Sequence, residues 1–169
     1  YGNLFITRVL IVDDASTDDT AVVFNSFKNE FTDFPLEYLR HPQNRGLTGG
    51  INTAFEMFLK DMQMNNPAIA YGLMDGDNSH APLAIPDMLR KICEGNDVVI
   101  ASRFRPGSRV VGVVWWRQVL SFGLTCIFKT IRNIPGVRDY SCGYRLYSPK
   151  IVEKVKKRFP NDVVFEKSF

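Results

Sequence analysis

Short apolar runs alternate with longer amphipathic stretches along the first hundred residues of the chain. Four apolar runs bounded by polar turn formers predict strands: residues 8–12, 36–39, 68–74 and 97–101. Three stretches with apolar residues at helical spacing predict helices: residues 18–31, 51–64 and 85–93. The stretch between the second strand and the second helix is polar and contains three glycines, which predicts a loop over residues 41–50. Strands and helices that alternate with short connections are typical of a parallel α/β sheet.

After residue 103 the pattern changes to one long apolar segment. Residues 110–131 are mostly apolar, with Trp115 and Trp116 adjacent, and this length would nearly span a bilayer. Arg117 and Lys129 interrupt the segment, so we predict a helix over residues 110–132 that is either buried in the core or interfacial. Both alternatives stay open from the sequence. A last amphipathic helix is expected over residues 148–158.

Polar side chains cluster where three of the predicted strands end. Asp13 and Asp14 follow the first strand, Asp75 and Asp77 the third, and Arg103 the fourth. In parallel α/β sheets, ligands bind beyond the carboxyl ends of the strands. Two carboxylates separated by Gly76 suit Mg²⁺ or Mn²⁺, although Asp, Gly, Asn and Ser also form plain turns.

Composition narrows the classes of protein that fit this pattern. The chain has 169 residues, enough for one domain, and 45% of them are apolar, as in an ordinary folded domain. The net charge of +3 fits an anionic ligand or a membrane surface. No Lys/Arg-dense run with interleaved aromatic residues is present, which argues against nucleic acid. Phosphate-loop, zinc-protease, nucleophile-elbow and dinucleotide-binding motifs are absent from the sequence, and its three cysteines show no metal-type spacing.

Five motifs follow one another along the chain: Ile-Val-Asp-Asp-Ala-Ser-Thr-Asp-Asp-Thr at 11–20, Asn-Arg-Gly-Leu-Thr-Gly-Gly-Ile-Asn-Thr at 44–53, Met-Asp-Gly-Asp-Asn-Ser-His-Ala-Pro at 74–82, Val-Val-Ile-Ala-Ser-Arg at 98–103 and Asp-Tyr-Ser-Cys-Gly-Tyr-Arg at 139–145. In this order they resemble the motifs of the inverting family 2 glycosyltransferases, in particular the subgroup that forms dolichol-phosphate mannose. The resemblance covers about residues 7–150. It implies a GT-A fold, a three-layer α/β/α sandwich with a mostly parallel sheet. It also implies transfer of mannose from GDP-mannose to a polyprenyl (dolichyl) phosphate, with inversion at the anomeric carbon.

The resemblance also sets expectations for the extent of the chain and its location. The family's usual opening strand is not in this sequence, so we expect residues 1–169 to be a fragment of a single catalytic domain that lacks its first strand. We expect it to lie on the cytoplasmic side of a membrane as a peripheral protein, with no transmembrane segment in this fragment. The alternatives are a UDP-sugar donor or a non-lipid acceptor, or a truncated non-catalytic domain that binds lipid or a partner.

The motifs assign roles to individual residues. We expect the nucleotide sugar to be bound by Asp13, Asp14, Ser16, Asn44, Gly46 and Asp75. The metal ligands would be Asp75, Asp77 and Ser79, where Ser79 stands in place of a glutamine found in several relatives. Phosphate groups would be bound by Arg103, Arg117 and Arg145, because guanidinium groups match phosphate oxygens. Arg103 and Arg145 would also serve catalysis, together with Asp139.

Two residues keep more than one interpretation. Asp139 is the general base by analogy with the family, but it is as plausibly a positioning group or an ion-pair partner for Arg145. A phosphate acceptor is already anionic at neutral pH, which leaves little need for a base. His80 is interpreted as a structural residue of the turn rather than as a catalyst.

Overall fold

A computed structural model of the chain describes residues 8–65, 67–105, 115–131 and 133–158. The chain forms two compact units, which we treat separately. The first unit comprises Tyr1–Ile69 with Pro149–Phe169, and the second comprises Ala70–Ser148. Both units combine helices with strands, so the predicted α/β class is confirmed.

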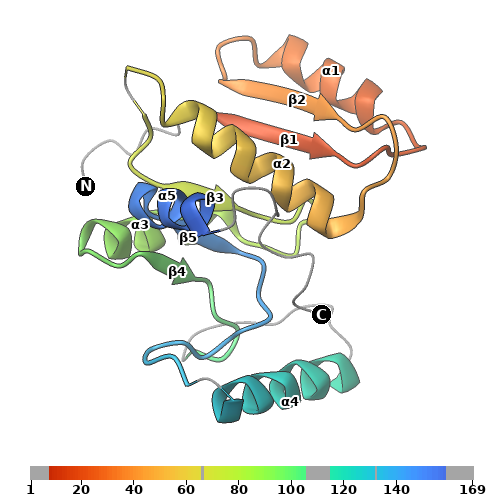
Figure 1. Cartoon of the computed structure of the whole chain (residues 1–169). Coiled ribbons are helices and arrows are strands. Elements are labelled where there is room, and N and C mark those ends of the chain that lie inside the picture. The colour runs from red at the N-terminus through yellow and green to blue at the C-terminus, as the bar shows by residue number, and fades with distance from the viewer. Residues whose placement is uncertain (1–7, 66, 106–114, 132, 159–169) are drawn as a thin grey trace. The chain divides into compact units, whose positions relative to one another are not determined.

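The first unit is built on a parallel pair of strands. Strands β1 (Val9–Asp13) and β2 (Leu36–Arg40) pair in register from Val9 opposite Leu36 to Asp13 opposite Arg40. Helix α1 (Thr20–Glu30) connects them, as the predicted strand–helix–strand pattern requires (Figure 1). Phe24 of α1 stacks on Tyr38 of β2 with the ring centroids 4.6 Å apart. This contact fixes the helix over the strand pair.

Helix α2 (Gly46–Asp61) packs against β1, and helix α5 (Pro149–Arg158) packs against α2. The prediction that residues 41–50 form a loop was wrong for its second half, because α2 begins at Gly46, five residues before the expected start. Gly49 faces the Arg45 side chain so closely that a Cβ atom there would lie 2.2 Å from the Arg45 Cβ. Close packing inside the helix therefore accounts for a glycine that the sequence analysis had assigned to a loop.

The second unit is built on a three-stranded sheet with the order β3-β5-β4. The central strand β5 (Arg145–Tyr147) is antiparallel to both β3 (Tyr71–Leu73) and β4 (Val98–Ile100). The sequence pattern does not predict a strand at β5, and antiparallel pairing was therefore not expected. The two predicted strands run in the same direction, but β5 lies between them.

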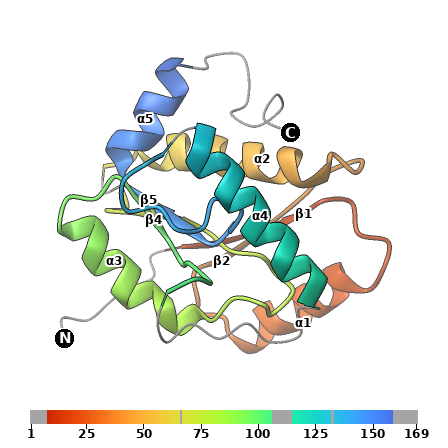
Figure 2. The ribbon, with the colours of Figure 1, turned by 90° about the horizontal axis from the view of Figure 1, so that it is seen from below.

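A small core holds the second unit together. Helix α3 (Ile85–Cys93), which follows a 3₁₀ turn at Pro82–Ala84, packs on β4 and β5 (Figure 2). The buried residues of this cluster come from α3, from β5 and from the segment just before β5: Met88, Ile92, Cys142, Tyr144 and Leu146. The motif at residues 139–145 is therefore anchored at its carboxyl end in the core.

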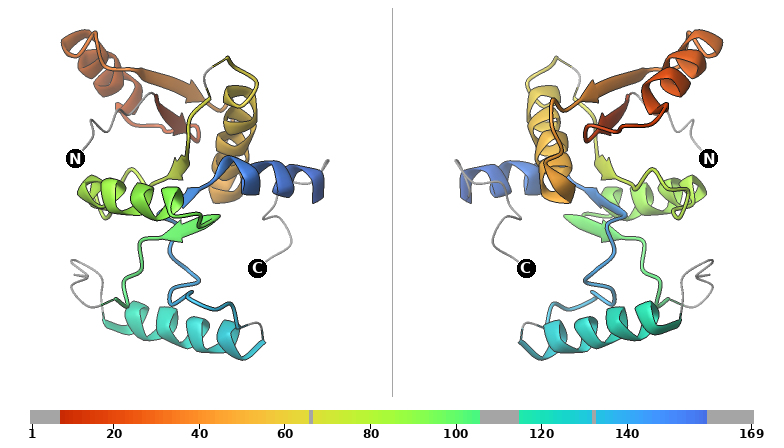
Figure 3. Two further views of the ribbon diagram at one scale, coloured as in Figure 1. Left: turned by 90° about the vertical axis from the view of Figure 1, so that its left-hand side faces the viewer. Right: turned by 90° about the vertical axis from the view of Figure 1, so that its right-hand side faces the viewer.

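Helix α4 (Trp115–Ile131) corresponds to the long apolar segment. Residues 110–114 and 132 of the predicted helix lie outside the described residues. Phe128 stacks on Tyr140 at 5.8 Å between ring centroids, which ties α4 to the loop before β5. Figure 3 shows the backbone of this loop beside α4. Large apolar side chains of α4 are nevertheless exposed at helical spacing, and we call them the α4 stripe: Trp116, Val119, Leu120, Leu124, Ile127 and Ile131. Within the described part of the chain, no helix is both long enough and apolar enough to cross a bilayer.

Candidate functional site

Asp13 lies at the end of β1 and holds the turn that follows it. Its buried carboxylate accepts hydrogen bonds from the backbone N–H of Ser16 at 2.7 Å and from the Tyr38 hydroxyl, and Arg40 lies 3.5 Å away. The hydrogen bonds from Ser16 and Tyr38 lower the pKa of Asp13 from 3.8 to about 2. Ala15 completes the turn with a φ of 61°, which is unusual for a residue other than glycine. Asp13 is therefore ionised at neutral pH and engaged within its own turn.

Asp14 joins the ends of both strands to the start of α2. One of its carboxylate oxygens accepts a hydrogen bond from the backbone N–H of Arg45 at 2.8 Å and lies 2.7 Å from Nδ1 of His41. His41 is buried, and its Nε2 lies 2.8 Å from the Thr53 hydroxyl. The contact with His41, followed by that with Arg45, lowers the pKa of Asp14. The Asp14 side chain remains 26% exposed, so of the two adjacent carboxylates it is the better placed to contact a ligand.

The other predicted nucleotide-binding residues of the first unit lie in the same loops. The Asn44 side chain accepts a hydrogen bond from the backbone N–H of Gly46 at 3.0 Å, and the Ser16 carbonyl accepts one from Arg40. Gly46 has a φ of 68°, a conformation that favours glycine. Sequence reasoning missed His41. The sole sequence signal for it was its position directly after the second predicted strand.

Asp75 and Asp77 follow β3, as predicted, and each is held by a different contact. The backbone N–H of Asp75 donates to Nδ1 of His80 at 3.1 Å, and the Asp75 side chain is 51% exposed. One oxygen of Asp77 accepts hydrogen bonds from the Ser79 backbone N–H at 3.0 Å and from the Ser79 hydroxyl at 2.5 Å, and these lower the pKa of Asp77. Asn78 has a φ of 60°, which Asn tolerates better than most residues. Ser79 thus orients the Asp77 carboxylate. That Ser79 is itself a metal ligand stays a prediction.

The donors at this turn fit a hard divalent cation. Two exposed carboxylates and a hydroxyl provide oxygen ligands alone, and Mg²⁺ usually takes one or two carboxylates and fills its other positions with water and substrate phosphate. No set of three or more His, Cys, Asp or Glu residues arranged to hold a metal occurs in the part of the chain that the structure describes. The two carboxylates and the hydroxyl therefore fit a cation that takes its remaining ligands from water and substrate phosphate.

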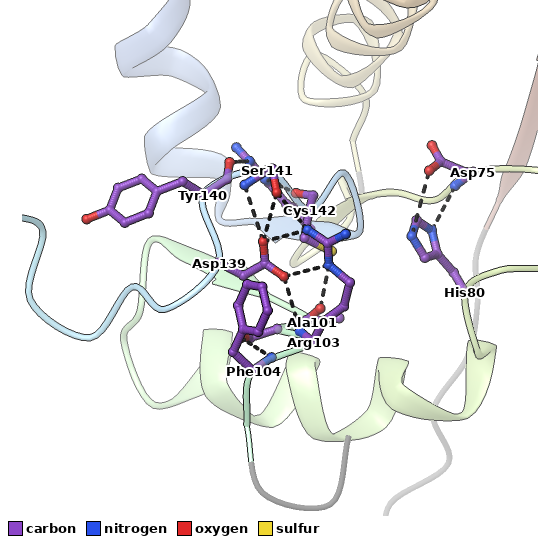
Figure 4. A network of polar contacts seen from close by, with 11 residues as sticks. Asp75, His80, Ala101, Arg103, Phe104, Asp139, Tyr140, Ser141 and Cys142 are labelled. Carbon is purple, nitrogen blue, oxygen red and sulfur yellow. Dashed lines mark hydrogen bonds and ion pairs between the residues drawn. The ribbon is translucent and has the colours of Figure 1, made fainter. Parts of the chain in front are cut away.

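The loop at residues 139–145 lies directly against Asp75. A Cβ atom built on Gly143 would lie 3.6 Å and 3.8 Å from the two carboxylate oxygens of Asp75. Two motifs that are almost seventy residues apart in the sequence therefore meet at this carboxylate. Figure 4 shows Asp75 and His80 beside the polar network of the same loop.

That network is centred on Asp139, which is fully buried. Nε and Nη2 of Arg103 donate to the two carboxylate oxygens at 2.8 and 2.9 Å, and the Arg103 backbone N–H donates at 3.2 Å (Figure 4). Ser141 accepts a further hydrogen bond from Nη2 at 2.6 Å and donates to Asp139 at 3.2 Å. Burial alone would raise the pKa of Asp139, but the hydrogen bonds from Arg103 outweigh it and hold the pKa below its usual value. Asp139 is therefore an ionised anchor for the Arg103 guanidinium group.

Two of the three predicted phosphate-binding arginines, Arg103 and Arg145, have described side chains, and their surroundings differ. Arg145 donates to the carbonyl oxygens of Cys142 and Tyr140, both at 2.7 Å, and so holds the loop in shape. The alternative that Asp139 pairs with Arg145 was wrong, because Arg103 is the guanidinium that it binds. Arg117 lies in α4, and its side chain is outside the described residues. Sequence spacing could not distinguish the environments of Arg103 and Arg145.

Comparison with known proteins gives a consistent result. Residues 5–156 match the family described as glycosyl transferase family 2. The chain is 29% identical over 151 residues to a polyprenol monophosphomannose synthase of Mycolicibacterium smegmatis, a match that covers 88% of this chain and 53% of that protein. It is 24% identical over 150 residues to a dolichol-phosphate mannosyltransferase of Pyrococcus furiosus, covering 88% and 40%. It is 29% identical over 142 residues to an undecaprenyl-phosphate mannosyltransferase of Micrococcus luteus, covering 82% and 54%. The chain thus spans about half the length of these relatives or less.

Proposed function

The chain belongs to glycosyl transferase family 2, and we propose that it transfers a sugar from a nucleotide diphosphate donor to a polyprenyl phosphate. The α/β fold is that of the GT-A class expected for this family. The observation that carries the proposal is the meeting of the Asp75 carboxylate with the loop that holds the Arg103–Asp139 pair. An exposed carboxylate and an arginine held by the adjoining loop are the two kinds of group that bind a metal-associated phosphate.

We further propose that the sugar is mannose, that GDP-mannose is the donor and that transfer inverts the anomeric carbon. In support, the three relatives are named as a polyprenol monophosphomannose synthase and as mannosyltransferases of dolichol phosphate and undecaprenyl phosphate. A UDP-sugar donor and a non-lipid acceptor remain the competing assignments. The first differs from ours in the nucleoside of the donor, and the second differs in the acceptor.

Each group has a role that follows from its surroundings. Asp75 and Asp77 would hold a Mg²⁺ or Mn²⁺ ion, with Ser79 orienting Asp77. When bound, such an ion neutralises the charge that develops on a nucleoside diphosphate leaving group. Arg103, held by Asp139, would bind and orient a phosphate group. Asp14 in the first unit would contact the nucleoside.

We assign Asp139 a positioning role instead of that of a general base. Its carboxylate accepts hydrogen bonds from Arg103 and Ser141, and these hold its pKa below the usual value despite its burial, which opposes proton uptake. An anionic phosphate acceptor does not need to be deprotonated. The residues therefore support a reaction that depends on orientation and charge stabilisation.

Binding of the donor tests this function directly. Calorimetry in the presence of Mn²⁺ is expected to show binding of GDP-mannose at least about tenfold tighter than UDP-glucose, a difference of about 1.4 kcal/mol. Stronger binding of UDP-glucose would favour the alternative donor. If the chain binds neither nucleotide sugar, the non-catalytic alternative gains support and the proposed transfer is wrong for this chain.

We also propose that the protein lies peripherally on the cytoplasmic side of a membrane through the α4 stripe. Transfer of exposed apolar side chains from water into an apolar phase lowers the free energy by about 25 cal/mol per Å² of buried surface. Replacing Trp116 and Leu120 with serine is expected to reduce co-flotation with phosphatidylcholine vesicles several-fold. Leu83→Ser is the matched control, since Leu83 is 90% exposed in the same unit but lies outside the stripe. Equal flotation of the double variant and the control would contradict a membrane role for α4.

A further inference from the structure

The imidazole of His80 contacts Asp75 at two points. Nδ1 accepts a hydrogen bond from the Asp75 backbone N–H at 3.1 Å, and Nε2 lies 3.7 Å from a carboxylate oxygen of the same residue (Figure 4). An Nδ1 that accepts a hydrogen bond carries no proton, so the proton of the neutral ring lies on Nε2 and points to the side of the carboxylate. One ring therefore acts on both the backbone and the side chain of a single aspartate.

The His80 ring is held in place by stacking on Tyr144. His80 stacks on Tyr144 with the ring centroids 4.9 Å apart and the planes inclined by 17°. Tyr144 is buried in the core, and its hydroxyl donates to the Ala81 carbonyl at 3.0 Å. Only 16% of the His80 side chain is exposed. Tyr144 thus connects the position of the imidazole to the core of the second unit.

Asp75 and Asp77 differ in how they are oriented. Asp77 is held by Ser79, two residues away in the same turn, through contacts that local sequence alone provides. Asp75 makes its contacts with His80 and rests against Gly143, the neighbour of Tyr144. The orientation of Asp75 therefore depends on tertiary structure, and His80 is the side chain that transmits it.

We propose that His80 is a positioning residue that holds Asp75 in the orientation needed to bind a divalent cation. This role rests on the proposed metal site at Asp75 and Asp77, and His80 is the residue that preorganises that site. Groups that orient metal-binding carboxylates commonly contribute 10- to 100-fold to metal affinity. The ring does so through its two nitrogen atoms, whereas stacking on Tyr144 keeps it in place.

Three substitutions separate these contributions. His80→Phe keeps an aromatic ring on Tyr144 but removes both nitrogen atoms. His80→Asn retains an acceptor near the position of Nδ1, and His80→Gln retains a donor near the position of Nε2. We expect His80→Phe to weaken Mn²⁺ binding to the 169-residue chain about tenfold or more. We expect His80→Asn to recover most of that loss and His80→Gln to recover less.

A metal-free measurement tests the positioning itself. Loss of the hydrogen bond should accelerate amide hydrogen exchange at Asp75 about tenfold in His80→Phe, with His80→Asn close to wild type. Wild-type Mn²⁺ affinity and wild-type exchange at Asp75 in His80→Phe would overturn the proposal. Faster exchange throughout β3 and β5 would also overturn it, because His80 would then stabilise the unit as a whole.

Asp75→Ala distinguishes failure of the positioning role from failure of the metal site. If this variant loses Mn²⁺ while His80→Phe binds it normally, the metal site stands and the role of His80 is wrong. If Asp75→Ala binds Mn²⁺ as the wild type does, or the wild type binds none, the metal site is wrong and the inference falls with it.

Discussion

Replacing Asp75 with alanine is expected to lower kcat/KM for sugar transfer by roughly 10³-fold while leaving the fold intact. The Asp75 side chain is half exposed and lies beyond the end of β3, so its removal leaves no buried cavity. A metal that stabilises a departing diphosphate contributes several kcal/mol to the transition state, and about 4 kcal/mol corresponds to a factor of 10³. Transfer of labelled sugar to a polyprenyl phosphate, followed at saturating Mn²⁺, measures the loss.

A second exposed carboxylate of the same unit provides the control. Asp87 lies on α3, where its 79% exposed side chain pairs with Arg90 at 3.0 Å. Such surface pairs contribute little to stability, so Asp87→Ala is expected to behave as the wild type in both folding and transfer. If Asp75→Ala retained activity within about threefold of that control, the assignment of Asp75 to the reaction would be wrong. Unfolding midpoints of both variants would show whether any loss comes from the fold.

The placement of the acidic turns could be predicted because it depends on local sequence. Apolar runs that end in Asp-Asp or Asp-Gly-Asp mark strand ends, and the structure places Asp13 at the end of β1 and Asp75 just beyond β3. The contact between Ser79 and Asp77 is likewise short-range. The approach of Gly143 to Asp75 and the pairing of Arg103 with Asp139 could not be predicted, since both depend on tertiary packing.

Two incorrect predictions about the fold have the same physical origin. The pattern of β5 spans three residues, Arg145–Tyr147, which is too short for an alternation of apolar and polar residues to show. Its antiparallel pairing brings Leu146 so near β3 that a Cβ atom on Gly72 would lie 2.6 Å from it. The polar stretch over residues 41–50, with its three glycines, was predicted as a loop, whereas α2 begins at Gly46 and close packing on Arg45 explains Gly49. In both cases packing decided what local propensity could not.

The Arg103–Asp139 pair is expected to behave as one unit for both stability and catalysis. Removing either partner leaves the other charge uncompensated, and for buried pairs this costs about 3 to 5 kcal/mol. Because Arg103 is 31% exposed, we expect about 3 kcal/mol for each of Arg103→Ala and Asp139→Ala. The double variant is expected to lose about 4 kcal/mol, well below the additive value, since the second change removes a charge that the first left unpaired. Urea unfolding of the three variants measures this coupling.

The pH dependence of stability provides a further test of the Arg103–Asp139 pair. The folded-state pKa of Asp139 lies below the ordinary value of 3.8, so its contribution to stability is present above that value and is lost as pH falls through the lowered pKa. Asp139→Asn should remove this part of the acid dependence. The Arg103–Asp139 contact should also respond to salt less than the exposed pair of Asp87 and Arg90 does, because the Asp139 carboxylate is fully buried.

Kinetics then separate a positioning role of Asp139 from that of a general base. If Asp139 acts by orienting Arg103, then Arg103→Ala, Asp139→Asn and the double variant should each lose roughly 10²-fold in kcat/KM, because one function is removed in all three. A general base would give Asp139→Asn a much larger loss than Arg103→Ala and would remove the acidic limb of the pH–rate profile. We expect the three variants to lose kcat/KM equally and to keep the pH–rate profile of the wild type. The Asp139 carboxylate already accepts hydrogen bonds from Arg103 and Ser141, and an anionic phosphate acceptor has no proton that must be removed.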